Sequence, residues 1–191
     1  MQIDSLGGGV FTLRGFLGPD ACAELIAFGD RLGYGEAVIS TDDGDQLLKD
    51  ARNNDRIILD DAALSARLYT AARDHLPQQI DGWRLSGFND RLRFYRYGSQ
   101  QYFKWHQDGT FRKSDREESF LTFMVYLNDG YGGGHTQFKW DTVAPQAGMA
   151  LVFPHRLMHQ GSEVTSGVKY VLRTDVMYRA PDASPRSGDA P

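Results

Sequence analysis

Apolar residues recur at helical spacing in two stretches of the first half of the chain. The first stretch begins at Pro19, which suits a first helical turn, and ends before Gly33. The second begins near Asp60 and ends before Pro77. The apolar residues at this spacing are Ala21, Leu25 and Phe28 in the first stretch and Leu64, Leu68 and Ala72 in the second. The pattern predicts two helices.

The second half has short segments rich in aromatic and β-branched residues, separated by Gly, Asn, Asp and Pro. They lie near residues 91–97, 119–127, 135–140, 148–153 and 168–178. Short strands at such spacing are typical of an all-β sandwich or barrel. Helices followed by strands predict a single α+β domain in which the helices pack on a β core.

Two of these segments place charged and phenolic side chains on one face, because strand side chains alternate. The residues on these two faces are Arg91, Arg93, Tyr95 and Tyr97 in one strand, and Lys169, Val171, Arg173, Asp175 and Met177 in the other. The opposite faces are more apolar and are expected to pack. The polar faces therefore meet solvent or line a cavity, and such a cavity suits an anionic small molecule.

Two histidines and an aspartate stand out as candidate metal ligands. His106 and Asp108 are two residues apart in QYFKWHQDGTF, so an extended strand end puts both side chains on one side. His159 follows far downstream in MHQGSEV. Two imidazoles and one carboxylate form the facial triad of non-haem iron(II) oxygenases, which leaves coordination positions open. The H-x-D pair alone is weak evidence.

The other histidines have simpler interpretations. His155 precedes His159 by four residues, which is ligand spacing on a helix, but the segment PHRLM follows a strand and is expected to be a turn. His155 is therefore the alternative to His159. His75 is expected to end a helix, and His135 to lie in a glycine-rich turn.

Composition narrows the class of protein. The chain has 191 residues, enough for one well-buried domain, and its net charge of −4 disfavours a nucleic-acid partner. It shows neither a signal-peptide pattern nor an apolar run of membrane-spanning length, so we expect a cytoplasmic protein without membrane contact. The small, polar residues 180–191 predict a disordered tail after a single domain over residues 1–179.

Five ordered elements carry a family resemblance. They are FYRYGSQQYFKWHQDG, LTFMVYLND, GGGHTQF, VAPQAGMALVFPH and HQGSEVTSGVKYVLRTDVMY. Over roughly residues 85 to 178 the chain resembles the prolyl 4-hydroxylase-like branch of the 2-oxoglutarate/iron(II)-dependent dioxygenases. The resemblance implies a mainly β, α+β fold. A double-stranded β-helix core, a cupin-like jelly-roll, would span about 81–179 after a helical N-terminal part over about 1–80.

The resemblance also implies roles for particular residues. His106, Asp108 and His159 would bind Fe(II) and form the catalytic centre. Lys169, ten residues after the distal histidine, would pair with the remote carboxylate of 2-oxoglutarate. Arg173 is the alternative, because other branches use a more distant arginine there.

The same resemblance places further side chains at the cosubstrate. Tyr97 would hydrogen-bond the remote carboxylate, and Tyr95 would replace it if the register shifts. Thr136 would face the cosubstrate pocket. Residues 41–56, including Arg52, Asn53 and Asn54, are either a solvated loop or a flap over the site, and residues 111–119 are a candidate rim loop.

The implied reaction is hydroxylation of an unactivated C–H bond, coupled to decarboxylation of 2-oxoglutarate to succinate and CO2. Fe(II), 2-oxoglutarate and O2 would be required, with ascorbate as a reductant. The substrate would be a prolyl residue in a protein or peptide. The alternatives are a small molecule or free amino acid, with Arg91 and Arg93 favouring an acidic one if they line the cavity. A non-catalytic cupin-like binding protein is a further alternative.

Overall fold

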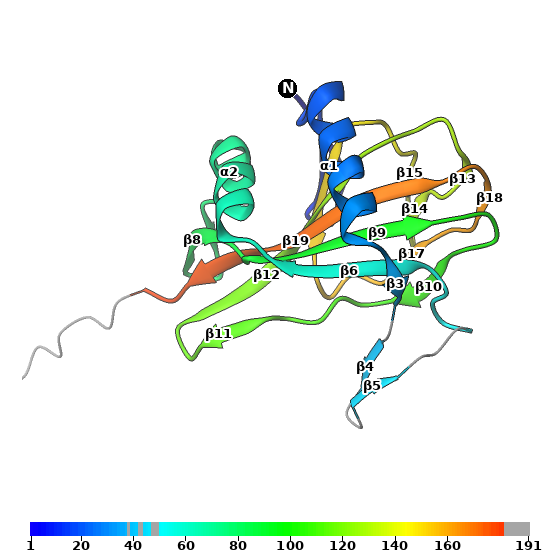
Figure 1. Cartoon of the computed structure of the whole chain (residues 1–191). Helices are drawn as coiled ribbons and strands as arrows, with labels where there is room; N and C mark the ends of the chain where they lie inside the picture. The colour runs from blue at the N-terminus through cyan, green and yellow to red at the C-terminus, as the bar shows by residue number, and fades with distance from the viewer. Residues whose placement is uncertain (38, 42–43, 47–49, 182–191) are drawn as a thin grey trace, which may run out of the picture.

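The structure is a computed structural model, and it describes residues 1–37, 39–41, 44–46 and 50–181, with side chains described outside 38–49. Two helices lie on one side of a large β-sheet, and a smaller sheet faces its other side (Figure 1). The helical elements are α1 (Pro19–Leu32), α2 (Ala62–Ala72) and the 3-10 turn η1 (Arg73–His75). Both helices predicted from apolar spacing are confirmed. No helix in the described residues is long and apolar enough to cross a membrane.

The large sheet has eleven strands, and its path runs β1-β2-β16-β12-β19-β9-β6-β3, with β7, β8 and β11 attached beside it. Its strands are β1 (Gln2–Gly7), β2 (Val10–Arg14), β3 (Gly35–Glu36), β6 (Asp55–Asp60), β7 (Gln79–Ile80), β8 (Trp83–Phe88), β9 (Arg91–Tyr97), β11 (Arg112–Ser114), β12 (Glu117–Tyr126), β16 (Ala150–Pro154) and β19 (Lys169–Arg179). Strands far apart in the sequence therefore pair in its centre.

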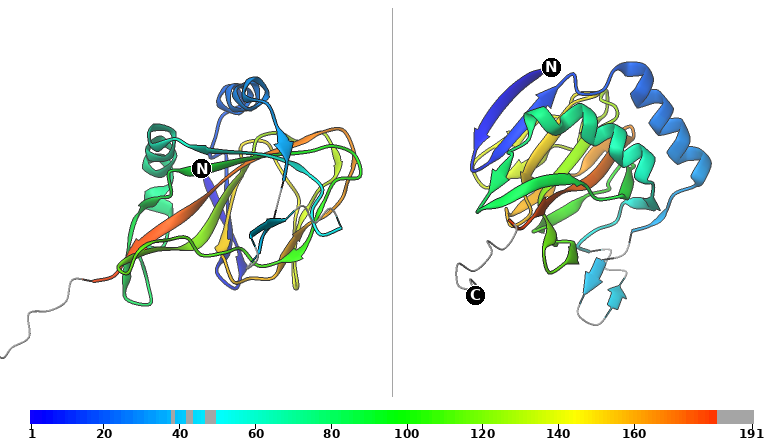
Figure 2. Two further views of the ribbon diagram at one scale, coloured as in Figure 1. Left: turned by 60° about the horizontal axis from the view of Figure 1, so that its bottom comes forward. Right: turned by 90° about the vertical axis from the view of Figure 1, so that its left-hand side faces the viewer.

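The smaller sheet has four strands in the order β10-β17-β14-β15. These are β10 (Phe103–His106), β14 (Thr136–Phe138), β15 (Thr142–Val143) and β17 (His159–Gly161). Two further ribbons pair β13 (Gly132–Gly133) with β18 (Val164–Ser166), and β4 (Ile39–Thr41) with β5 (Gly44–Gln46). The views from other sides show the two sheets facing each other beneath the helices (Figure 2). This mainly β jelly-roll arrangement with flanking helices confirms the expected fold class.

The large sheet buries both of its faces, which explains the alternation seen in the sequence. One face packs against α1 and α2 and includes Leu92 and Phe94 of β9. The other face meets the small sheet and includes Tyr95 and Tyr97 of the same strand. The side chains of the polar face predicted for β9 and β19 therefore point, along part of these strands, into the space between the two sheets.

The N-terminal part departs from the expectation of a helical segment over about 1–80. β1, β2 and β6 belong to the large sheet: β2 pairs with β16, and β6 pairs with β9. Their pairing partners lie far along the chain, so the local sequence pattern does not show that these segments join the sheet, and β1 is mostly exposed. The expected tail over 180–191 falls, beyond Pro181, outside the described residues.

Gly148 at the turn before β16 provides a test of the packing. Its φ is +75°, and a Cβ atom there would collide with the carbonyl oxygen of Leu17. The Leu17 N–H donates to the Gly148 carbonyl at 3.0 Å, so the two chain segments cannot easily separate. Gly148→Ala is expected to lower the free energy of unfolding by about 2 kcal/mol or more. Gly35→Ala, where φ is ordinary and space is open, should change it little. Equal midpoints in urea unfolding would contradict this account.

Candidate metal and cosubstrate site

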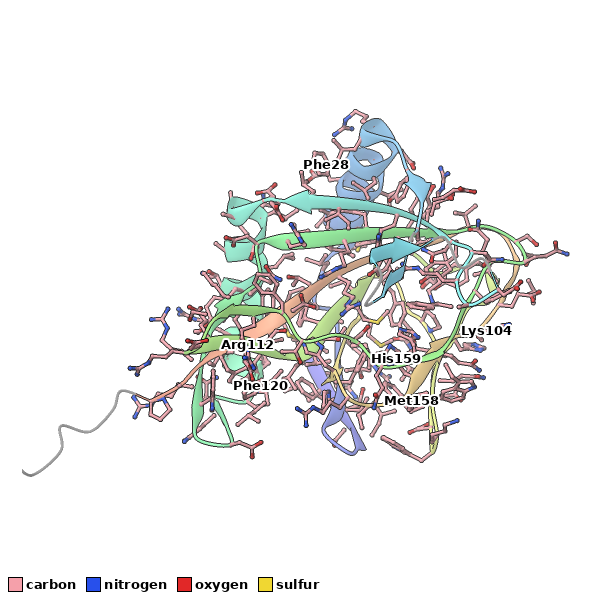
Figure 3. All side chains as sticks on the ribbon, turned by 90° about the horizontal axis from the view of Figure 1, so that it is seen from below. Phe28, Lys104, Arg112, Phe120, Met158 and His159 are labelled. Carbon is pink, nitrogen blue, oxygen red and sulfur yellow. The ribbon has the colours of Figure 1, made fainter. Side chains whose placement is uncertain are left out.

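The three candidate metal ligands converge between the two sheets. His106 ends β10, Asp108 follows two residues later, and His159 begins β17. His106 and His159 are paired residues in the register of β10 and β17. One ligand atom from each of the three residues lies within 4.8 Å of the others. In the view from below, His159 lies among side chains between the sheets, whereas Arg112 and Phe120 lie toward another end of the molecule (Figure 3).

Both imidazoles present Nε2 to the carboxylate. His106 Nε2 lies 3.6 Å from Asp108 Oδ1, and His159 Nε2 lies 3.7 Å from Oδ2. Each Nδ1 instead meets a backbone carbonyl, that of Lys104 at 2.7 Å and that of Leu157 at 2.9 Å. A carbonyl can only accept, so Nδ1 carries the proton and Nε2 keeps a free lone pair. This is the arrangement that a histidine needs to bind a metal.

The protonation states also suit a cation. Burial raises the pKa of Asp108, but the charge of Arg173 and the contacts of the two histidines outweigh it and hold that pKa well below its usual range. Burial lowers the pKa of His159 to about 4. At neutral pH the centre therefore offers an ionised carboxylate and a neutral buried imidazole. Two nitrogens and one carboxylate oxygen on one side of a cavity match the donor set of a non-haem iron(II) site.

A single cavity is lined by all eight residues that the family resemblance implies at the metal and the cosubstrate. It is lined by Tyr95, Tyr97, Phe103, His106, Asp108, Thr122, Met124, Thr136, Phe153, His159, Gly161, Lys169, Val171 and Arg173. Pairing of β9 with β19 sets Tyr97 opposite Lys169 and Tyr95 opposite Val171. Sequence reasoning did not single out Thr122 or Met124. The alternation along SFLTFMVY would have placed them on one face, away from Phe123.

Lys169 is a buried cation with an incomplete set of partners. Its side chain is 2% exposed, and its Nζ donates to the Gly134 carbonyl at 2.6 Å. The rings of Tyr97 and Tyr126 lie 5.2 and 5.4 Å from Nζ. Within the described residues no carboxylate pairs with it, and burial lowers its pKa to about 7. A carboxylate ligand would complete its hydrogen bonds and restore its charge.

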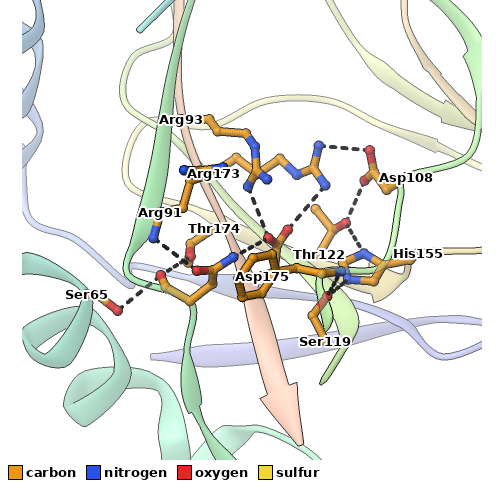
Figure 4. A network of polar contacts seen from close by, with 12 residues as sticks. Ser65, Arg91, Arg93, Asp108, Ser119, Thr122, His155, Arg173, Thr174 and Asp175 are labelled. Carbon is orange, nitrogen blue, oxygen red and sulfur yellow. Dashed lines mark hydrogen bonds and ion pairs between the residues drawn. The ribbon is translucent and has the colours of Figure 1, made fainter. Parts of the chain in front are cut away.

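Arg173 is different, because it is already paired. Its two terminal nitrogens contact Asp108 Oδ1 at 2.8 Å and Asp175 Oδ1 at 3.3 Å. Arg93 contacts the other oxygen of Asp175 at 3.1 Å. Both arginines and both aspartates thus form one network beside the metal site (Figure 4). Arg173 therefore holds a candidate metal ligand.

The other singled-out residues lie outside the cavity lining. Arg91 pairs with Asp60 at the surface. His135 and His155 are not in the ligand cluster, and residues 155–158 form the expected turn. The predicted link between Arg91 or Arg93 and an acidic substrate thus loses its premise, since neither side chain lines the cavity.

The two candidate covering segments have separate outcomes. Part of the segment of residues 41–56 lies outside the described residues. Within its described part, Arg52 is 4% exposed, and its guanidinium packs over the rings of Tyr95 and Phe103, at 4.6 and 4.5 Å from their centroids. Arg52 thus packs against two residues that line the cavity but does not line it itself. In 111–119, β11 pairs with β12, and only residues outside this segment line the cavity. A covering role for either segment stays a prediction.

Comparison with known proteins gives consistent results. A family model described as the 2OG-Fe(II) oxygenase superfamily matches residues 92–174. A protein of Acanthamoeba polyphaga mimivirus, named "Putative prolyl 4-hydroxylase", is 26% identical over 188 residues, covering 84% of this chain and 71% of the relative.

Solved structures share the fold at lower identity. The viral collagen prolyl hydroxylase vCPH from Paramecium Bursaria Chlorella virus-1, as its 2OG complex, is 22% identical with a TM-score of 0.64, covering 90% of this chain and 97% of that one. A Trichoplax adhaerens prolyl hydroxylase, in complex with a hypoxia inducible factor peptide fragment, is 15% identical with a TM-score of 0.68, covering 88% and 83%. The family match spans His106, Asp108, His159 and Lys169. Residues 92–174 of the chain are thus similar to the 2OG-Fe(II) oxygenase superfamily, whose members use Fe(II), 2-oxoglutarate and O2.

Proposed function

We propose that this chain hydroxylates a prolyl residue in a protein or peptide, with Fe(II) held by His106, Asp108 and His159. The observation that carries the proposal is the convergence of two Nε2 lone pairs and one ionised carboxylate in a buried cavity. Bound there, the metal would supply the centre at which 2-oxoglutarate and O2 react to oxidise a C–H bond.

The protein's own contribution to the metal centre is orientation. The backbone carbonyls of Lys104 and Leu157 fix the tautomers of the two histidines. Arg173 and Thr122 each hold one oxygen of the Asp108 carboxylate. The three ligands are thus set before a metal arrives, which lowers the cost of ordering them on binding.

Lys169 is proposed to bind the remote carboxylate of 2-oxoglutarate. It is the cavity cation that lacks a carboxylate partner in the described structure, whereas Arg173 has two. Tyr97 lies opposite Lys169 in the sheet, and Thr136 accepts a hydrogen bond from the Tyr126 hydroxyl at 2.7 Å in the same cavity. These side chains provide polar contacts at the end of the cosubstrate pocket.

Apolar side chains complete the cavity. The ring of Phe103 stacks on His106, with centroids 3.5 Å apart, and Phe153 lies edge-on to His159 at 4.5 Å. Together with Val171 they line the cavity with carbon atoms. Such walls exclude water from the ligands and strengthen the electrostatic contacts within the site.

The prolyl substrate is inferred from the relatives. Their names describe prolyl hydroxylases, and one was solved with a peptide fragment. A free amino acid or small molecule remains the alternative substrate, while ascorbate dependence and the lack of a nucleic-acid partner stay predictions. Incubation with proline-containing peptides, Fe(II) and 2-oxoglutarate should yield products heavier by one oxygen atom, detected by mass spectrometry. Matched peptides with alanine in place of proline should stay unchanged. Succinate release with free proline, without any peptide product, would favour the small-molecule alternative.

Lys169 also predicts a pH dependence of 2-oxoglutarate binding. Burial lowers its pKa to about 7, so it loses its charge as pH rises through that value. A bound carboxylate favours the charged form, so the dissociation constant of 2-oxoglutarate should rise above pH 7. The rise should approach about tenfold per pH unit until the pKa of the complex is reached. Calorimetric titrations between pH 6 and 9 measure this. In Lys169→Met the dissociation constant of 2-oxoglutarate should be higher at every pH and should change little with pH. A wild-type dissociation constant that does not change with pH would contradict the assignment.

A further inference from the structure

His155 is a buried polar residue that the metal site does not use directly. It is 1% exposed, follows β16, and does not line the cavity. Its Nδ1 lies 2.9 Å from the hydroxyl of Thr122, and its Nε2 lies 2.8 Å from the hydroxyl of Ser119 (Figure 4). Both ring nitrogens thus have partners, and the partners lie on β12.

The direction of these hydrogen bonds can be assigned from Asp108. Its carboxylate is paired with Arg173 through Oδ1, so its other oxygen can only accept, and the Thr122 hydroxyl must donate to Oδ2, at 2.5 Å. A hydroxyl has a single hydrogen, so Thr122 has none left for His155. The contact between Thr122 and Nδ1 therefore requires that Nδ1 carries the proton and donates it.

The contact between His155 and Ser119 is consistent with a proton on Nδ1. When the single ring proton of His155 lies on Nδ1, Nε2 is an acceptor, and it lies 2.8 Å from the Ser119 hydroxyl. The Ser119 hydroxyl can donate to Nε2, because its oxygen already accepts from the backbone N–H of Phe111 at 2.8 Å. Every hydrogen bond from Phe111 through Ser119, His155 and Thr122 then points toward Asp108.

His155 also holds Asp108 by its backbone. The Asp108 N–H donates to the His155 carbonyl at 2.9 Å. Arg173 contacts the other carboxylate oxygen, Oδ1, at 2.8 Å. Asp108 is therefore held at its main chain and at both oxygens, which leaves its carboxylate one orientation. The contact on Oδ2 depends on where the Thr122 hydrogen points.

We propose that His155 is a positioning residue of the metal centre, which keeps the Thr122 hydroxyl oriented as a donor to the Asp108 carboxylate. The inference rests on the proposed function, in which Asp108 binds the metal. Without the Nδ1–H donor, Thr122 is free to turn toward other acceptors, and the Asp108 carboxylate then loses the contact on Oδ2 while keeping the one on Oδ1. Loss of such an outer partner typically lowers metal affinity about 10- to 100-fold.

The test is metal affinity, measured calorimetrically with Mn²⁺, which mimics Fe(II) and is stable in air. His155→Leu removes both ring nitrogens at similar bulk, and we expect its affinity to fall about 10- to 100-fold. His155→Asn places an amide N–H near the position of Nδ1, so it should still donate to Thr122 and recover most of the affinity. Its amide does not reach Ser119, so recovery would assign the effect to the Thr122 contact.

A matched control separates positioning from stability. Tyr178→Phe removes a partly buried side-chain hydrogen bond, to the Pro77 carbonyl at 2.9 Å, from a residue outside the cavity lining. It should lower the thermal midpoint and leave the Mn²⁺ affinity unchanged. If His155→Leu does not fold, Ser119→Ala serves in its place, because it removes the donor that selects the tautomer of the intact ring. We expect a smaller but measurable loss of affinity there.

The outcomes distinguish a failure of the proposed metal centre from a failure of the positioning role of His155. Wild-type protein that binds no Mn²⁺, or binding that survives Asp108→Ala, would overturn the proposed metal centre and this inference with it. Binding that is lost in Asp108→Ala but unchanged in folded His155→Leu would overturn the positioning role alone. So would equal losses in His155→Asn and His155→Leu, because the Nδ1–H donor would then be irrelevant.

Discussion

Replacing His159 with alanine is expected to abolish iron binding and reduce 2-oxoglutarate turnover to background, a loss larger than the about 100-fold typical of outer partners. His159 supplies a bare Nε2, fixed by the Leu157 carbonyl, and it is 5% exposed, so solvent cannot readily replace it. With only His106 and Asp108 remaining, the cavity keeps two protein ligands. Anaerobic Fe(II) titration of the purified variant, followed by succinate measurement in air, tests this.

The matched control for this variant is His75→Ala. His75 lies at the end of η1, outside the ligand cluster, so its loss should leave iron binding and turnover unchanged. Unaltered iron binding in His159→Ala would mean that another residue is the distal metal ligand, and His155 would then be the first residue to test. Thermal unfolding of each metal-free variant shows whether the loss is one of ligand or of fold.

Lys169→Met is expected to raise the KM for 2-oxoglutarate about 10- to 100-fold, the equivalent of one lost charge-assisted contact of about 1.5–3 kcal/mol. Methionine keeps much of the length and apolar stem of lysine but removes the ammonium group. Iron binding without cosubstrate should persist, because Lys169 bonds to Gly134 and is not one of the clustered ligands. Steady-state succinate assays across 2-oxoglutarate concentrations measure the change.

Arg173→Lys is the comparison that separates the two candidate anchors. It keeps a cation near Asp108 but removes the fork that also reaches Asp175. We expect it to weaken metal binding more than it changes the KM for 2-oxoglutarate. The reverse result, with a raised KM in Arg173→Lys and an unchanged one in Lys169→Met, would assign the cosubstrate carboxylate to Arg173.

The sequence allowed most of the cavity to be anticipated, because its chemistry follows strand alternation. Tyr95 and Tyr97 on β9, and Lys169 and Arg173 on β19, were expected on shared faces, and they line one cavity. The helices were equally predictable from the sequence. For example, α2 begins after Asp61, whose side chain caps the helix by accepting a hydrogen bond from the Leu64 N–H. Local periodicity is sufficient for both features.

What the sequence did not reveal depends on contacts between distant strands. The pairing of β2 with β16 joins residues separated by most of the chain, and no local pattern encodes it. The same holds for His155, which meets Thr122 only because β12 and β16 are neighbours. Arg173 likewise could be placed on the cavity face, but its pairing with Asp108 required the fold.

The most direct test of the metal and cosubstrate centre needs no primary substrate. Metal-free protein receives Fe(II) and then 2-oxoglutarate under anaerobic conditions, and the visible absorption of the iron–2-oxoglutarate chelate is recorded. A weak charge-transfer band in the wild type, absent from His159→Ala and Asp108→Ala, is the predicted result. Bound iron without such a band would indicate a different cosubstrate or a binding protein, and a chain that binds no iron would contradict the central claim.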